Sequence, residues 1–211
     1  YRNDCLDHAV VVSFTILGCL FNRAAVVSGA RKDSSAFTGV MFMGHYFDQQ
    51  PESGHQEQDV LVRMNGKDFH FLTDKSVFSK QRLDYGTALL LQAVLKDDFP
   101  KTGRLLDLGC GYGAVGIIMK KLRPAFSVVL SDINERAVSL AQKNAIENQV
   151  KSVEVIQSDG FSAIKGNFDV IMTNPPVRAG KKTVFRLFEE SAEHLTPQGR
   201  LVVVMRKQQG A

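Results

Sequence analysis

The segment Arg104–Ile117 reads R-L-L-D-L-G-C-G-Y-G-A-V-G-I and decides the fold. Its short apolar run gives way to three glycines at alternate positions, Gly109, Gly111 and Gly113, and then to an apolar helical pattern that ends before Pro124. A buried strand, a glycine loop and a helix form the first unit of an open α/β sheet. Glycines in such a loop permit positive φ angles, and the helix N-terminus offers unpaired N–H groups to a ligand. The segment therefore predicts a nucleotide-like ligand.

Two carboxylates indicate which ligand this is. The glycine spacing is G-x-G-x-G, whereas the pyrophosphate of a dinucleotide is bound by G-x-G-x-x-G. Asp107 stands at the end of the predicted strand, where its charge would repel a pyrophosphate but suit a sulfonium or ammonium group. Asp132 follows the next predicted strand, 23 residues after Gly109, and is placed to accept hydrogen bonds from both ribose hydroxyls. S-adenosylmethionine, which carries a sulfonium and no phosphate, is therefore the predicted cofactor.

The composition is that of a soluble globular protein with one core. The 211 residues are 44% hydrophobic and 23% charged, and the net charge of +4 with a pI near 9.0 mildly favours a nucleic-acid partner. Cys5, Cys19 and Cys110 lack the spacing of metal ligands and are odd in number. We therefore expect no metal site and a cytoplasmic location, because free thiols persist in a reducing compartment.

The sequence divides into three parts. Residues 1–42 include an apolar run, Ala9–Phe21, that is too short to span a membrane, and the residues before it are too acidic for a signal peptide. We interpret residues 1–42 as an appendage without a defined role and expect no membrane partner. Residues 43–59 are polar and predict a linker, and residues 60–211 form the predicted domain.

Strand and helix patterns alternate along the predicted domain. Asn65-Gly66 lies between two runs of alternating apolar residues, the strongest short signal for a β-hairpin. The patterns that follow indicate an α/β fold with a doubly wound, mostly parallel sheet. The predicted helices are Ala88–Leu95, Ala114–Met119, Glu135–Asn148 and Lys182–His194, and the predicted strands are Leu105–Leu108, Phe126–Leu130, Val153–Gln157, Phe168–Thr173 and Leu201–Met205. Thr196–Gly199 predicts a turn before the last strand.

Polar residues follow the carboxyl ends of four predicted strands. These residues are Asp107, Asp132, Asp159 and Asn174. Each one alone could form an Asx turn. Ligands of open α/β sheets bind at the carboxyl ends of the strands, so four such residues in register favour a binding site.

The tetrad Asn174-Pro175-Pro176-Val177 carries the predicted chemistry. An exocyclic base amine is a poor nucleophile because its lone pair is delocalised into the ring. The side-chain carbonyl of Asn174 and the backbone carbonyl of Pro175 could accept both amine hydrogens and turn the lone pair toward a methyl sulfonium. The rigid prolines would preset this alignment. The structural alternative is an Asn-Pro turn that ends a strand.

Several motifs in order resemble one family. DLGCGYGAVGI, SDINERAV, QSDGF and TNPPVRAGK, with the upstream FSKQRLDYGTALLL, are similar to the class I S-adenosylmethionine-dependent methyltransferases of the small-domain family. Among these, the chain resembles a single-domain relative of the small-subunit ribosomal RNA guanine-N2 methyltransferases. The match covers Val60 to Ala211. The resemblance implies a Rossmann-like fold, S-adenosylmethionine as cofactor and RNA as partner.

The resemblance also implies roles for individual residues. The cofactor-binding set is Asp107, Gly109, Gly111, Gly113, Asp132, Ile133, Ser158, Asp159 and Asn174, with Asp159 near the adenine. The clamp on the methyl acceptor is Asn174, Pro175 and Pro176. The residues expected to contact substrate are Phe78, Ser79, Asp84, Val177, Arg178 and Lys181, of which the first three match a segment that closes over cofactor and substrate.

Three departures from the family pattern change what is expected. Val177 replaces the aromatic residue of adenine-modifying enzymes, so a flipped base cannot stack there. Tyr1–Asp59 is too short for the degenerate second domain of the large ribosomal RNA enzymes, so RNA recognition must differ. Family members continue with a further helix and two strands, so the C-terminal strands are expected to be missing here. Leu201–Met205 would then form an exposed edge of the sheet.

The leading hypothesis is an N-methyltransferase that acts on guanine N2 in ribosomal RNA. Arg178, Lys181 and Lys182 could hold phosphates, or they could be solvated charges at a helix start. One alternative is a protein-glutamine amide methyltransferase, because an amide nitrogen presents the same two hydrogens. A non-catalytic module that binds the cofactor or RNA is the other. The sequence does not indicate an oligomeric state.

Overall fold

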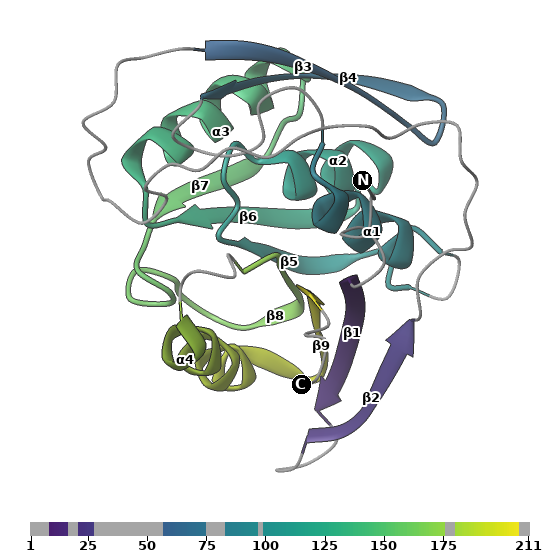
Figure 1. Ribbon diagram of the computed structural model, residues 1–211, viewed down its shortest axis with the longest axis vertical. Helices are drawn as coiled ribbons and strands as arrows, with labels where there is room; N and C mark the ends of the chain where they lie inside the picture. The colour runs from purple at the N-terminus through teal and green to yellow at the C-terminus, as the bar shows by residue number, and fades with distance from the viewer. Residues whose placement is uncertain are drawn as a thin grey trace, which may run out of the picture.

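The computed structural model describes residues 9–16, 21–27, 57–74, 83–96, 99–175 and 180–206. Its main sheet has seven strands in the order β2-β1-β9-β8-β5-β6-β7, and β3 and β4 form a separate hairpin (Figure 1). The strands are β1 (Ala9–Ile16), β2 (Phe21–Val27), β3 (Glu57–Met64), β4 (Lys67–Asp74), β5 (Gly103–Leu108), β6 (Phe126–Asp132), β7 (Val153–Gln157), β8 (Phe168–Thr173) and β9 (Leu195–Arg206). The helices are α1 (Tyr85–Val94), α2 (Ala114–Leu122), α3 (Glu135–Glu147) and α4 (Gly180–Glu193).

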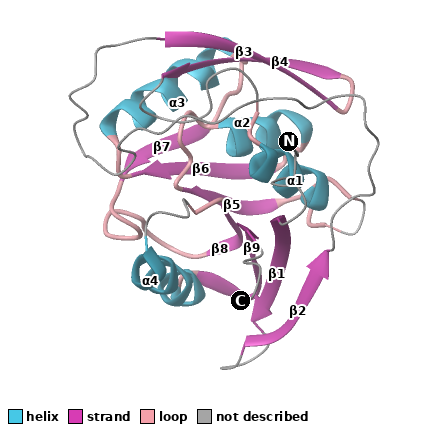
Figure 2. Cartoon of the chain, in the orientation of Figure 1, coloured by secondary structure: helices cyan, strands magenta, loops and turns pink. Residues whose placement is uncertain are grey.

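Five parallel strands, β5 to β9, form most of the sheet, and β7 is its edge. Side chains alternate between the two faces of each strand. Leu105 and Val128 pack in one core cluster with residues of α1, α2 and α3. Leu106 and Val129 lie in a second cluster, against which Leu187 of α4 packs. Helices therefore cover both faces, and Figure 2 shows α4 apart from the other three. The predicted α/β fold with a doubly wound, mostly parallel sheet is confirmed.

Local sequence signals place most of the elements correctly. Asn65 and Gly66 have φ values of +47° and +75°, as a two-residue turn between β3 and β4 requires, so the predicted hairpin is confirmed. Helix α1 begins at Tyr85, three residues before the predicted Ala88. The earlier start has a clear cause, because the side chain of Asp84 caps the helix by accepting from the N–H of Thr87.

Strands β1 and β2 extend the main sheet beyond β9. Strand β1 pairs antiparallel with β9 from Ala9 opposite Arg206 to Thr15 opposite Arg200, and β2 pairs antiparallel with β1. Val11 and Val12 are buried. The prediction that Leu201–Met205 would be an exposed edge is therefore wrong, because β9 is paired on both sides. The domain limits proposed from the sequence stay predictions.

Strand β9 also includes the residues predicted to form a turn. Phe168 of β8 pairs with Leu195, whereas Val170 pairs with Arg200, so the register shifts by three residues over Thr196–Gly199. A Cβ atom on Gly199 would lie 2.9 Å from the carbonyl oxygen of Phe168, which explains why glycine occupies this position. The predicted turn is corrected to a bulge within a continuous strand.

Two asparagines of α3 fasten the β3–β4 hairpin to the sheet domain, and Figure 1 shows the hairpin lying over α2 and α3. The Asn144 amide accepts from the N–H of Leu72 and donates to its carbonyl, at 2.7 and 2.8 Å. The Asn148 amide makes the same pair of bonds to His70, at 3.0 and 2.6 Å. Residues four apart on a helix and two apart on a strand are separated by about 6 and 7 Å, so the two amides match one edge of β4. The side-chain amides thus replace a neighbouring strand.

We predict that Asn144→Ala lowers the free energy of unfolding by about 1–3 kcal/mol, because it removes the partner of the buried Tyr112 carbonyl and of the partly buried backbone groups of Leu72. Urea unfolding would measure the loss. Gln142→Ala, on the exposed side of the same helix, is the matched control and should change stability by less than about 0.5 kcal/mol. Equal stability of the Asn144→Ala variant and the wild type would show that this amide does not hold the hairpin.

Candidate functional site

The glycine loop between β5 and α2 forms one wall of the candidate site. Gly109, Gly111 and Gly113 have φ values of +70°, +55° and +89°, in the left-handed region that favours glycine. The N–H groups of Gly109 and Cys110 both donate to the carbonyl of Ser131 in β6, at 2.8 and 2.9 Å, which fastens the loop to the neighbouring strand. A Cβ atom on Gly109 would meet open space. The backbone at this position is therefore accessible to a ligand.

Asp107 joins the end of β5 to the start of α2. The N-cap residue of α2 is Gly113, which has no side chain to cap the helix. Asp107 supplies the missing acceptor, because its Oδ2 accepts from the N–H of Gly116 at 2.9 Å. Burial raises the pKa of Asp107 to about 7; the bond from Gly116 opposes this rise, and the negative charge of Asp132 adds to it. A cationic ligand would favour the ionised form of this carboxyl.

Asp132 braces the glycine loop from the end of β6. Its Oδ2 accepts from the N–H of Gly111 at 2.8 Å, and its Oδ1 accepts from the N–H of Asn134 at 2.9 Å. Burial raises the pKa of Asp132, while these backbone bonds oppose the rise. The N–H of Ile133 also acts on this carboxylate, so three backbone donors brace it and its predicted contact with the ribose hydroxyls stays a prediction.

Asn174, at the end of β8, is fixed by the N-terminus of α1. Its Nδ2 donates to Asp84 Oδ1 and to Thr87 Oγ1, at 3.1 Å in each case. Gly86 makes this approach possible, since a Cβ atom there would lie 3.1 Å from Nδ2 and 3.2 Å from Oδ1 of Asn174. Both amide hydrogens are thus used within the protein. The amide oxygen of Asn174 is left as the acceptor, which is the atom that the predicted chemistry requires.

A small pocket brings these groups together. Its volume is about 30 Å³, which is the size of one small chemical group and not of a whole cofactor. The lining residues come from α1, the glycine loop, α2 and the ends of β5 and β8, and they are Asp84, Thr87, Asp107, Gly109, Cys110, Gly111, Tyr112, Ala114, Val115 and Asn174. Five residues predicted to bind cofactor or substrate therefore share one pocket: Asp84, Asp107, Gly109, Gly111 and Asn174.

The other predicted cofactor residues lie outside this lining. Gly113 packs under α3, because a Cβ atom there would meet Ala141 at 3.1 Å. The side chain of Ser158 is buried and bonds within its own loop, accepting from the N–H of Ala163 at 3.0 Å. The half-buried Ile133 accepts a bond through its carbonyl from Gln157 at 3.1 Å. Their cofactor roles stay predictions.

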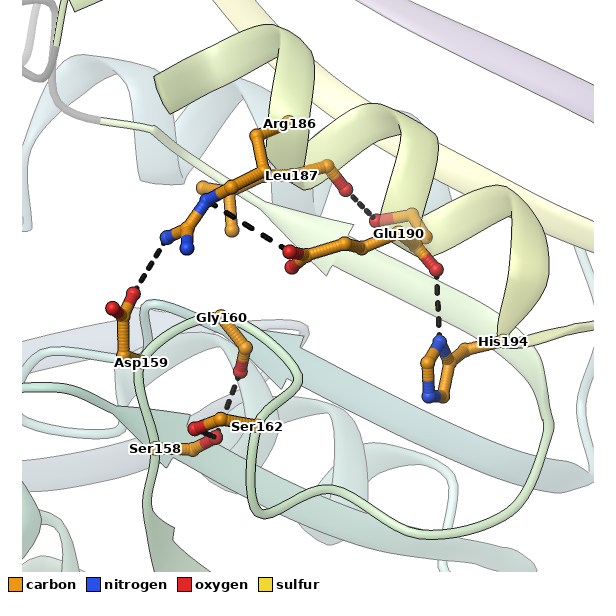
Figure 3. Close-up of polar contacts among 9 residues, drawn as sticks. Ser158, Asp159, Gly160, Ser162, Arg186, Leu187, Glu190 and His194 are labelled. Atoms are coloured by element: carbon orange, nitrogen blue, oxygen red, sulfur yellow. Dashed lines mark hydrogen bonds and ion pairs between the residues drawn. The ribbon is translucent and has the colours of Figure 1, made fainter. Parts of the chain in front are cut away.

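Asp159 faces α4. Figure 3 shows Arg186 reaching from α4 to the carboxylate of Asp159, with Nη2 at 2.6 Å from Oδ1. Glu190 lies on the other side of the same guanidinium, at 3.8 Å from Nε. The Asp159 side chain is 53% exposed, so an ion pair of this kind contributes little stability by itself. One oxygen of Asp159 is committed to Arg186, and its predicted contact with adenine stays a prediction.

Some predicted residues cannot be placed. Phe78, Ser79, Pro176, Val177 and Arg178 lie outside the described residues, and Lys181 is described only as part of the backbone of α4. Pro175 is half-buried next to Asn174. The roles of Pro175 and Pro176 in the clamp, and those of Arg178 and Lys181 in substrate binding, therefore stay predictions.

Sequence reasoning did not identify three residues that shape the site. Thr87 holds Asn174, and Gly116 lets α2 approach Leu130 of β6 closely enough for the Asp107 cap. The hydroxyl of Tyr112 is buried in the pocket wall and has no hydrogen-bond partner among the described residues. The G-x-G-x-G-x-x-G spacing of the loop contains Gly116, whereas Thr87 directly precedes the predicted helix Ala88–Leu95 and gives no signal of its role.

Other kinds of chemistry find no support in the described part of the chain. It contains no group of three or more His, Cys, Asp and Glu that could hold a metal ion. No helix within it is long and apolar enough to cross a membrane. Burial raises the pKa of the Cys110 thiol, and the charges of Asp132 and Asp107 add to the rise, so this thiol stays protonated and is no nucleophile.

The lining of the pocket fits a cation better than a phosphate. It contains two carboxylates, an amide and the glycine backbone, and its described residues include no lysine or arginine. The predicted contact of Asp107 with the sulfonium fits this lining, whereas Asp132 lies outside it and its predicted contact with the ribose stays a prediction. A doubly wound sheet with this glycine loop and these two acids defines a class I S-adenosylmethionine-dependent methyltransferase.

The comparisons with known proteins agree with this class. Residues 68–211 match the family described as the methyltransferase small domain, and the chain belongs to this family. It is therefore an S-adenosylmethionine-dependent methyltransferase, and the bound cofactor supplies an activated methyl group on its sulfonium.

Two relatives differ in how much of their length is covered. An uncharacterized protein, YbxB, from Bacillus subtilis strain 168 is 41% identical over 169 residues, which are 79% of this chain and 83% of that protein. Ribosomal RNA small subunit methyltransferase C from Pasteurella multocida strain Pm70 is 41% identical over 132 residues. That match covers 61% of this chain but 39% of the relative, so the chain spans about two fifths of that enzyme.

Solved structures support the fold alone. Wild-type Trm5b from Pyrococcus abyssi matches with a TM-score of 0.53 at 22% identity. The match covers 70% of this chain and 40% of the Trm5b chain. The ribosomal protein L11 methylase from Lactobacillus delbrueckii matches with a TM-score of 0.51 at 23% identity. That match covers 59% of this chain and 65% of the methylase chain.

The raised pKa of Asp107 predicts a pH dependence of stability. Because its pKa in the folded protein is above its ordinary value of 3.8, the folded state binds the proton more tightly. The stability that this group contributes is fully present below about pH 4 and is lost as the pH rises through 7. We expect the ligand-free protein to melt at a lower temperature at pH 8 than at pH 5. Asp107→Asn keeps an acceptor for the helix cap and should make this decline shallower.

Thermal melts of both proteins from pH 5 to 8 would measure the difference. The largest effect that this shift allows is roughly 4 kcal/mol. Parallel curves for the wild type and Asp107→Asn would show that Asp107 titrates with an ordinary pKa.

Proposed function

We propose that the chain transfers a methyl group to an exocyclic amine of RNA, namely guanine N2 in the RNA of the small ribosomal subunit. The observation that carries this proposal is the orientation of Asn174. Asp84 and Thr87 take up both of its amide hydrogens, so its oxygen is the atom available to a substrate. An acceptor there suits a nucleophile that donates hydrogen, as an amine does.

Acceptance of an amine hydrogen would make the nitrogen a better nucleophile. The bond holds the amine hydrogen in one direction, which turns the nitrogen lone pair away from the Asn174 oxygen and out of conjugation with the ring. Asn174 lines the same pocket as Asp107 and the glycine loop, where the cofactor is expected. The chain would thus lower the barrier by aligning the amine with the methyl group, without forming a covalent intermediate. Alignment alone can lower a reaction barrier by a large amount.

RNA as substrate is supported by charge and by the relatives. The net charge of +4 favours a polyanion. The relative from Pasteurella multocida is named as a methyltransferase of the small ribosomal subunit RNA. The expected partner is accordingly ribosomal RNA or a ribosomal subunit, met in the cytoplasm.

The substrate assignment is tested with labelled cofactor. Small ribosomal subunits and their naked RNA, prepared from cells that lack the gene, are incubated with the protein and methyl-labelled S-adenosylmethionine. We expect label in RNA, recovered after nuclease digestion as N2-methylguanosine by mass spectrometry. Label in a protein glutamine would instead support the amide methyltransferase. Cofactor binding without transfer to either would support a non-catalytic module.

Asn174→Ala tests the mechanism. We expect the single-turnover rate of methyl transfer to fall by roughly 100-fold while cofactor affinity changes little, because the lost contact acts on alignment in the transition state. Asn174→Asp should not restore the rate, since it removes both donors and places a second carboxylate next to Asp84. Thermal melts control for misfolding. A wild-type rate in a folded Asn174→Ala variant would remove Asn174 from the mechanism.

A further inference from the structure

The side chain of Thr87 occupies a special place in the first turn of α1. It is buried, at 7% exposure, although the helix packs mainly apolar residues against the sheet. Its backbone N–H is bound by Asp84 Oδ1 at 3.0 Å, and its hydroxyl oxygen accepts from Asn174 Nδ2 at 3.1 Å. A buried hydroxyl is costly unless it is hydrogen-bonded, so its pairing with Asn174 is significant.

The hydrogen bonds around Asn174 run in one direction. Asp84 Oδ1 accepts from the Thr87 N–H and also from the NH₂ group of Asn174, so it faces the donor end of that amide. The hydroxyl of Thr87 can also donate to Asp84. Burial raises the pKa of Asp84, and side-chain hydrogen bonds from Thr87 and Asn174 counteract that rise. The Asn174 amide is thus the donor to both groups, and the Thr87 hydroxyl oxygen and the Asp84 carboxylate are its acceptors.

This direction decides which end of the amide faces the pocket. The two ends of an Asn side chain have nearly the same shape, so packing alone distinguishes them poorly. Asp84 makes one bond to the NH₂ group, and Thr87 makes the second, which fixes both hydrogens. The β-branched Thr87 side chain has few χ1 rotamers, so its hydroxyl holds a defined position.

We propose that Thr87 is a positioning residue for methyl transfer, and that its hydroxyl holds the Asn174 amide with the oxygen toward the methyl acceptor. This inference rests on the proposed function of Asn174 as the acceptor of an amine hydrogen. Thr87 needs no contact with substrate or cofactor in this role. It acts through Asn174.

Two substitutions separate the hydroxyl from the shape of the side chain. Thr87→Val keeps the volume and β-branching but removes the hydroxyl, whereas Thr87→Ser keeps the hydroxyl. We expect Thr87→Val to lower the single-turnover rate on the ribosomal substrate by about tenfold, the value of one hydrogen bond, with cofactor affinity nearly unchanged. Thr87→Ser should recover most of the rate. A role in helix packing alone would give the opposite order, since Val preserves more contacts than Ser.

A second measurement does not depend on any substrate. The side-chain NH₂ signals of Asn174 in a ¹⁵N–¹H spectrum, assigned by their loss in Asn174→Asp, report on both amide hydrogens. We expect one of the two signals to shift and to exchange faster with water in Thr87→Val, and both to stay near their wild-type positions in Thr87→Ser. Unchanged signals in Thr87→Val would overturn the inference.

The two measurements distinguish failure of the inference from failure of the proposed function. If the wild type transfers no methyl group to RNA but the Asn174 signals respond to Thr87→Val, the proposed substrate is wrong and the hydrogen-bond arrangement stands. If methyl transfer occurs and Thr87→Val neither slows it nor changes the signals, the proposed function stands and Thr87 has no positioning role.

Discussion

The bond between the Asp107 carboxylate and the N–H of Gly116 is the interaction on which the site depends. It gives a hydrogen-bond acceptor to an N–H group in the first turn of α2, whose own N-cap residue is a glycine. The acceptor comes from the preceding strand, β5. The glycine loop is thereby held between two fixed ends. Its remaining freedom is removed by Asp132, which binds the N–H of Gly111 from the neighbouring strand. Two acids that sequence reasoning assigns to the ligand therefore also build the loop that would receive it.

Such double use explains why both acids are buried although the described residues that line the pocket include no lysine or arginine. Burial raises the pKa of both Asp107 and Asp132, so their charged forms are unfavourable until something offsets the loss of water. A positively charged cofactor would provide that offset. Ligand binding and stability of the loop are consequently linked, and an aspartate is needed where an asparagine would suffice for the cap alone.

Structural features that depend on neighbouring residues could be predicted from the sequence. Features that arise where distant parts of the chain meet could not. Asn65-Gly66 fixes the hairpin because the turn geometry is local, and the alternation of apolar patterns gives the central sheet. The pairing of β1 with β9 is not accessible in this way, because an apolar strand does not specify its partner. Thr196–Gly199 has turn residues, yet β8 beside it allows a bulge. Asp84 and Asn174 are 90 residues apart, and Thr87 joins their network only once α1 is docked. The acids of the site follow from local patterns, whereas the residues that orient Asn174 do not.

The position of β1 beside β9 has a consequence for synthesis of the chain. Ala9 and Arg206 are partners although 197 residues separate them. The ribosome releases β1 early and β9 late, and at roughly 5–20 residues per second the delay is about 10–40 s. During that interval β5 to β8 can assemble with α1 to α3, because their contacts are nearer in sequence, while β1 has no partner in the central sheet. We therefore expect the pairing of β1 with β9 to complete the seven-stranded sheet after the glycine loop has formed.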